Sequence, residues 1–222
     1  MRVQRGDEGV ELRLRAQFGV ERAVIDDVVA VSAARPRAQQ RRGVEVADAE
    51  PRPVRHERRR RGEAEVAVLA ACLKDIDLRE PARWCLARMN CQGAADALVE
   101  AFKTATGTEY RVGLVNALGR KQGSNVLETL KIAAGDKEPE VALAAVEALA
   151  NTPDAALDAV ISSVESGSSS RRAARVARAR VRLGSTLMRA GDDAGAKQVF
   201  TAVAGADVDE APKKAAAAAV GG

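Results

Sequence analysis

A pattern of two short helices recurs about every thirty residues in the C-terminal two-thirds of the chain, and it limits the possible folds more than any other feature. Aligning the first helices on Met89, Leu118 and Leu149 gives spacings of 29 and 31 residues. We expect first helices over 79–89, 108–118 and 138–149, and second helices over 94–103, 124–134 and 153–164. Their apolar residues recur at i, i+3 and i+4, which is one face of an α-helix. A two-helix unit of this size cannot bury its apolar faces alone, so such units stack against their neighbours.

The residues at the predicted helix boundaries agree with this pattern. Pro81, Pro139 and Pro153 lie in first turns, where a missing N–H costs nothing. Ser124 and Asp136 are candidate caps for the helices that follow them. Only three Phe, one Trp and one Tyr occur among 222 residues, whereas strands favour aromatic and β-branched side chains. The sequence therefore predicts an all-α protein.

Several segments resemble bacterial HEAT-repeat proteins. The most specific is GDKEPEVALAAVEAL (135–149), and LREPARWCLARM and EYRVGLVNALGRK are similar to other helices of that family. The resemblance covers about residues 70–165. It implies an armadillo-like α-solenoid of stacked antiparallel helix pairs, with a scaffolding or binding role and no catalytic residue.

The C-terminal third departs from that pattern. Residues 168–190 predict one long Arg- and Ala-rich helix, and LMRAGDDAGAKQVFTAV, within about 183–204, resembles a tetratricopeptide-type turn. We expect the helical repeat domain to cover 66–207 and the start of a truncated further helix to cover 208–222. No polar capping helix follows, although solenoids normally need capped ends, so both ends of the predicted solenoid look cut.

Residues 1–65 have a different composition, with fifteen arginines, twelve acidic residues and no lysine. Large apolar residues are scarce there, so we expect this extension to be disordered or weakly structured. Three interpretations remain open. The interpretation that we favour is a mis-assigned start, because Arg-rich and Lys-free sequence is typical of a GC-rich gene read in the wrong frame. The others are a natural disordered extension and a basic arm for nucleic acid.

Two groups of residues are candidates for binding. One is a basic stripe on the long helix, whose members fall within about 60° of one another: Arg171, Arg175, Arg178 and Arg182. This stripe is either a phosphate- or acid-binding surface or the ordinary solvated face of an amphipathic helix. Arg180 points toward the apolar side, so we expect it to snorkel or to form an ion pair. The other group lies on the second helices, which usually line the concave face: Glu100, Lys103, Glu128, Lys131 and Asp158.

Chemistry-bearing residues are sparse. Cys72, Cys85 and Cys91 include no CxxC pair and the single histidine, His56, is remote, so we expect no metal site and no cofactor. No nucleophile or phosphate-loop motif is present, which predicts a protein that is not an enzyme and has no small-molecule substrate. We expect Trp84 to be partly buried in the core. No apolar run long enough to span a membrane and no signal peptide are visible, which predicts a cytoplasmic protein without membrane association.

Together these features predict a non-catalytic protein–protein interaction scaffold of the HEAT-repeat type. One alternative is binding of nucleic acid or an acidic ligand through the basic stripe, which a steep loss of affinity with salt would support. The other is a fragment of a larger multidomain protein whose activity lies elsewhere.

Overall fold

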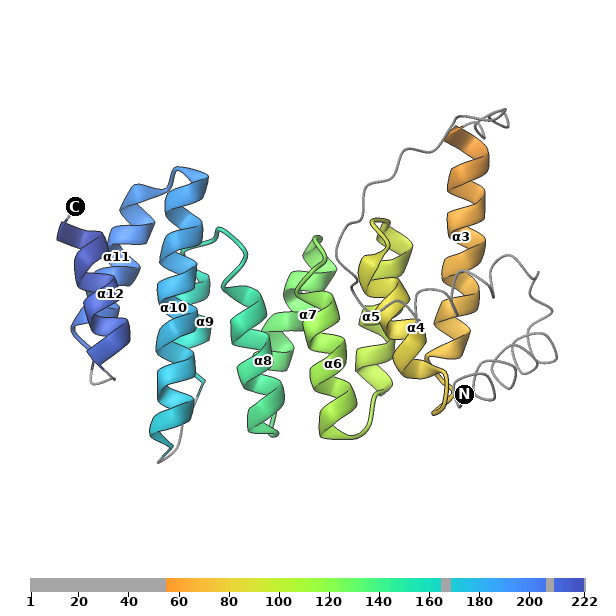
Figure 1. Cartoon of the computed structure of the whole chain (residues 1–222), viewed down its shortest axis with the longest axis horizontal. Helices are drawn as coiled ribbons and strands as arrows, with labels where there is room; N and C mark the ends of the chain where they lie inside the picture. Colours follow the sequence, from red (N-terminus) through yellow and green to blue (C-terminus); the bar gives the residue numbers. More distant parts are fainter. Residues whose placement is uncertain (1–54, 165–168, 207–209, 222) are drawn as a thin grey trace, which may run out of the picture. The chain divides into compact units, whose positions relative to one another are not determined.

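The computed structural model describes residues 55–164, 169–206 and 210–221, with side chains from residue 62 to residue 219 within those ranges. In these residues it contains ten helices and no strand, which confirms the predicted all-α class (Figure 1). The helices are α3 (Arg55–Cys72), α4 (Arg79–Arg88), α5 (Gln92–Thr104), α6 (Thr108–Leu118), α7 (Ser124–Ala134), α8 (Pro139–Leu149), α9 (Leu157–Ser162), α10 (Ser170–Ala190), α11 (Asp193–Ala204) and α12 (Glu210–Gly221). The chain divides into two compact units between Ala97 and Leu98, inside α5.

The first unit contains α3, α4 and the start of α5. Leu69, Leu78 and Leu86 are buried where α3 packs against α4. The predictions for residues 1–54 lie outside the described residues. Helix α3 begins at Arg55, so the predicted domain boundary at residue 66 falls within a helix. The local sequence accounts for this, because Arg, Glu and Ala after Pro53 are all good helix formers.

The second unit is built around α8. Six consecutive residues of this helix are buried: Val141, Ala142, Leu143, Ala144, Ala145 and Val146. A helix that is apolar on nearly every side must be covered on every side. Helix α8 accordingly contacts α6, α7, α9 and α10, while α10 contacts α9, α11 and α12 (Figure 1). The helices α6, α8, α10 and α12 thus form a sequence of neighbours, and α7 and α9 contact each other.

Two predicted helix caps and the length of one helix differ from the predictions. Ser124 is the first residue of α7 and does not cap it, since Gly123, with φ of 135°, occupies the cap position. Asp136 does not occupy the cap position of α8 either, because Glu138 does. Asp136 accepts a hydrogen bond from the backbone N of Glu138 at 2.9 Å. Helix α9 begins four residues later than predicted, and before it Asp154 accepts from the backbone N of Ala156 at 3.0 Å, where residues 155–156 form a turn.

Polar contacts join successive helix pairs. Arg111 of α6 forms an ion pair with Asp136, which lies just before α8, and its guanidinium stacks 5.0 Å from the centre of the Phe102 ring. The hydroxyl of Thr186 on α10 donates to the carbonyl oxygen of Ala150 at 3.1 Å. The ion pair of Arg111 with Asp136 and the hydrogen bond of Thr186 to Ala150 span 25 and 36 residues of sequence, so they fix one helix pair against the next.

The turn predicted within residues 183–204 is formed by Gly191 and Asp192. Gly191 ends α10 with φ of 86°, a left-handed conformation that favours glycine. Asp192 then caps α11 by accepting from the backbone N of Gly195 at 2.9 Å. The two helices pack closely, because the absent side chain of Gly184 leaves room for the buried ring of Phe200.

Candidate binding surface

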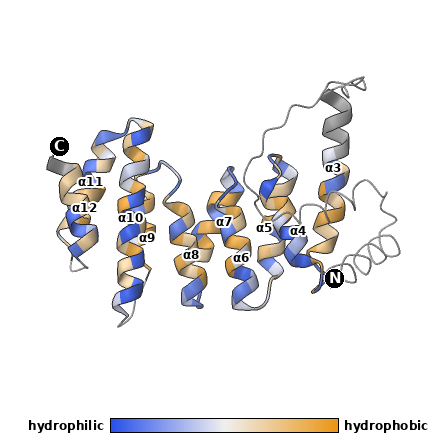
Figure 2. Cartoon of the chain, viewed as in Figure 1, coloured by the Kyte–Doolittle hydropathy of each residue, from blue (hydrophilic) through white to orange (hydrophobic). Residues whose placement is uncertain are grey.

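Helix α10 carries the largest net positive charge of the helices that the structure describes. Its sequence, SRRAARVARARVRLGSTLMRA, contains seven arginines and no acidic residue. Ser169 caps its start by accepting from the backbone N of Arg172. Leu183 and Leu187 are fully buried on one side, and the hydrophilic residues recur along the rest of the helix (Figure 2). The buried stripe fixes the rotation of α10 and therefore decides which arginines reach solvent.

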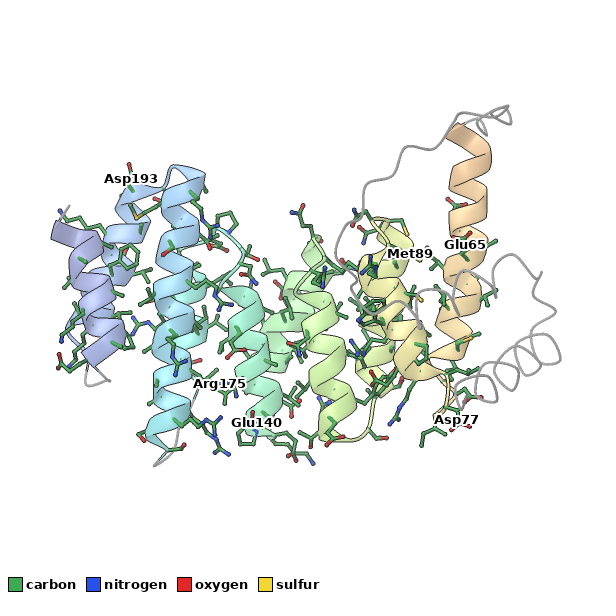
Figure 3. All side chains as sticks on the ribbon, in the orientation of Figure 1. Glu65, Asp77, Met89, Glu140, Arg175 and Asp193 are labelled. Carbon is green, nitrogen blue, oxygen red and sulfur yellow. The ribbon has the colours of Figure 1, made fainter. Side chains whose placement is uncertain are left out.

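The structure separates Arg175 from the predicted stripe. Its Nε donates to Glu147 at 2.8 Å and its Nη1 donates to Glu140 at 2.8 Å, both on α8 (Figure 3). The hydrogen bond to Glu147, followed by that to Glu140, raises the pKa of the Arg175 guanidinium above its ordinary value although burial lowers it. Arg175 therefore holds α10 against α8, and its charge is already matched.

Of the two outcomes that the sequence predicted for Arg180, snorkelling or an ion pair, the structure shows the ion pair. Its Nε donates to Oδ1 of Asp158 at 2.7 Å and its Nη2 donates to Oδ2 at 2.8 Å, a bidentate arrangement. The side chains of Arg180 and Asp158 are 13% and 20% exposed. This pair fixes α10 against α9. The sequence had suggested Asp158 as part of a binding surface, but its carboxylate is already matched by Arg180.

Three members of the predicted stripe are exposed and share their face with a fourth arginine that the sequence prediction omitted. We call Arg171, Arg178, Arg182 and Arg189 the exposed arginine row. Arg189 follows Arg171 by about five helical turns, so the same angular argument identifies it. Arg178 and Arg189 donate only to oxygens of their own helix. Within the residues that the structure describes, no carboxylate forms an ion pair with any member of the row.

The predicted residues on the second helices are largely matched to one another. Lys103 donates to Glu100 at 2.5 Å on α5, and Lys131 donates to Glu128 at 2.9 Å on α7. Such exposed pairs contribute little to stability and leave no net charge. Beside Glu128 the side chain of Ile132 is 72% exposed, which the sequence prediction missed. Its position four residues after an exposed glutamate on the same helix was the available signal.

Trp84 lies on the surface of α4, with 42% of its area exposed, so the predicted core position was wrong. The guanidinium of Arg88, one helical turn later, lies 4.9 Å from the centre of the indole ring. Leu86 occupies the buried face of this helix instead. The prediction for Trp84 was wrong because it relied on the apolar residues next to it in sequence, and adjacent residues on a helix point about 100° apart.

The three cysteines are free thiols that differ in environment. Cys72 is buried, Cys85 is partly buried and Cys91 is exposed. Burial raises the pKa of the Cys72 thiol to about 11, with smaller contributions from the charges of Asp75 and Cys85. Burial also raises the pKa of Cys85, against an opposing effect of Arg88. Both thiols are therefore held in the neutral form, which is a poor nucleophile.

Comparison with known proteins gives no identity for this arrangement. No protein-family model matches the chain, and no curated protein shows significant similarity to it. In the described ranges, no helix is long and apolar enough to cross a membrane, and no group of three or more potential metal ligands is found. The surfaces of α7 and α10 are thus the features on which a function can be argued.

Proposed function

We propose that this chain is a non-catalytic binding scaffold of the HEAT-repeat type, in which stacked helix pairs form an α-solenoid that binds a protein partner. The observation that carries the proposal is the order of contacts in the second unit. The helices α6, α8, α10 and α12 contact one another in sequence order, and α7 contacts α9. A repeat built this way exposes one row of second helices as an extended surface.

The surface residue best suited to a protein partner is Ile132. This apolar side chain is 72% exposed, which is unfavourable in water. Burying it at an interface with a partner would therefore be favourable. The ion pair between Glu128 and Lys131 lies beside it and supplies a polar rim. We therefore place the partner on the exposed face of α7.

Photocrosslinking tests this placement. Benzoylphenylalanine is introduced at Ile132 in the full chain in its natural host, and at Ile76 as the control. Ile76 is also apolar and is 73% exposed, but it lies between α3 and α4. We expect a discrete protein adduct from position 132 and none from position 76. Unlabelled wild-type protein should compete for this adduct, and the variant Ile132→Asp should not. Equal labelling at both positions, or none at 132, contradicts the proposal.

A role within a larger multidomain protein is compatible with the same surface. In that case the partner of α7 belongs to the same polypeptide. The adduct then appears as an intramolecular link in peptide mass spectrometry, whereas a separate partner gives a link between two proteins.

A further inference from the structure

No ion pair in the described residues joins the exposed arginine row to another helix. Arg175 and Arg180 are matched by Glu140, Glu147 and Asp158, which leaves the partly buried Arg172 and the four exposed members of the row without a carboxylate in this part of the chain. Four guanidinium groups on one helix face repel one another. A row of like charges at this density requires either solvation or an anionic ligand.

The row has a regular spacing that a linear ligand can follow. Its members are separated by seven, four and seven residues, which corresponds to about 10, 6 and 10 Å along the helix axis at ~1.5 Å per residue. Seven- and four-residue steps also keep side chains on one face of any α-helix. A second helix lying alongside α10 with acidic residues at these steps brings one carboxylate to each arginine.

Acidic residues border the row and restrict the width of the ligand. Glu140 and Glu147 lie on the adjacent helix α8, and their side chains are 54% and 37% exposed. A nucleic-acid duplex is about twice as wide as a single helix, and its phosphates carry charge on all sides, so part of it meets these carboxylates. A narrow segment contacts the row without approaching them.

The aromatic residues of this unit do not favour single-stranded nucleic acid. Phe102, Tyr110 and Phe200 are each at most 6% exposed, so none of them presents a ring on which bases stack. Single-strand binding combines a basic groove with such stacking platforms. Arginine, in contrast, binds carboxylates through two parallel N–H donors without any aromatic neighbour.

We propose that the exposed arginine row binds an acidic α-helical segment of a protein partner, with its carboxylates spaced to meet Arg171, Arg178, Arg182 and Arg189. This inference rests on the proposed binding function but uses a different surface, since Ile132 lies on α7. Exposed ion pairs are individually weak, so binding depends on several being formed together and decreases with salt.

Fluorescence anisotropy with the full chain tests the proposal. The probe is a labelled Ala-based helical peptide whose Glu residues lie on one face at the spacing of the row. A second peptide has the same composition with the Glu residues distributed around the helix. The variant is Arg178→Glu/Arg182→Glu, and the matched control is Lys137→Glu/Lys197→Glu. Both control lysines are exposed, and the two variants change the net charge equally. Circular dichroism confirms that each variant remains helical, and Arg178→Gln/Arg182→Gln serves as a milder second test.

We expect the one-face peptide to bind more tightly than its isomer, and the Arg178→Glu/Arg182→Glu variant to lose about tenfold or more in affinity at low salt. The lysine control is expected to change affinity by less than about twofold, because its charges lie outside the row. The proposal is overturned if both peptides bind alike, if the two variants lose affinity equally, or if duplex DNA of matched charge binds more tightly than the peptide. The crosslink at Ile132 is independent of all these outcomes, so failure here and failure of the proposed function are distinguishable.

Discussion

Replacing Gly184 by alanine is expected to destabilise the contact between α10 and α11. A Cβ built at this position lies 2.6 Å from Cε1 and 2.7 Å from Cζ of Phe200, well inside van der Waals distance. The ring is only 2% exposed, so it has no free space into which to move. Overpacking of this kind lowers stability by about 1 to 3 kcal/mol, and because the contact is so close we expect a loss near the upper end of this range. The better helix propensity of alanine returns about 1 kcal/mol, which leaves a net loss of about 2 kcal/mol.

Hydrogen exchange of the backbone amides in α10 and α11 measures this loss locally, even where the two units unfold separately. The companion variant Phe200→Leu removes the ring atoms that the new Cβ meets. In that background we expect Gly184→Ala to be neutral or stabilising, because only the helix-propensity gain remains. The reasoning is refuted if Gly184→Ala alone leaves exchange unchanged or slower, or if its cost persists after Phe200→Leu.

Two further predictions follow from the polar groups. Arg180→Ala leaves the partly buried carboxylate of Asp158 unmatched, so we expect it to lower the free energy of unfolding in urea by about 2 to 3 kcal/mol. Arg189→Ala, on the exposed face, is expected to lower it by less than about 0.5 kcal/mol. Equal effects of the two variants would show that the ion pair contributes nothing to stability. Because folding raises the pKa of Cys72 from 9.0 to about 11, the stability that this group contributes is complete below pH 9 and is lost as the pH rises to about 11. Trp84 fluorescence follows unfolding of the same unit, and Cys72→Ala is expected to lessen its pH dependence in that window; an unchanged profile contradicts the assignment.

The positions of α6 and α7 were predictable because their apolar residues recur with the period of an α-helix, and both helices begin and end where that pattern does. In α8 six successive positions are buried, so no such period is visible there, and Pro139 in its first turn was the clearer signal. The prediction was less accurate where one local hydrogen bond decides the outcome. Asp154 accepts from the backbone N of Ala156 in the segment before α9, whereas the sequence pattern placed Asp154 within a helix over 153–164. Sequence periodicity cannot distinguish these two uses of an aspartate.

The candidate site was predicted only in part, for a different reason. Angular position on α10 correctly grouped the arginines on one face, and it also predicted that Arg180 would need a partner. It could not show that Arg175 meets Glu140 and Glu147, because those residues come from another helix some thirty positions earlier. Pairing across helices depends on the rotation and offset of both, which no single-helix pattern contains. Ile132 was missed because a lone exposed apolar residue resembles an ordinary core position in a sequence.

The distinction between matched and unmatched charge provides the strongest argument about function. Each ion pair of α10 can be explained by the fold, since Arg175 joins α10 to α8 and Arg180 joins it to α9. The exposed arginine row cannot be explained in this way, because in the described residues no carboxylate forms an ion pair with it, and Arg178 and Arg189 donate only to oxygens of α10. These like-charged residues repel one another, which lowers local stability. Such local costs occur in proteins at functional sites. A fold does not by itself determine a function, so the exposed arginine row, and not the all-helical architecture, is the feature from which a partner can be inferred.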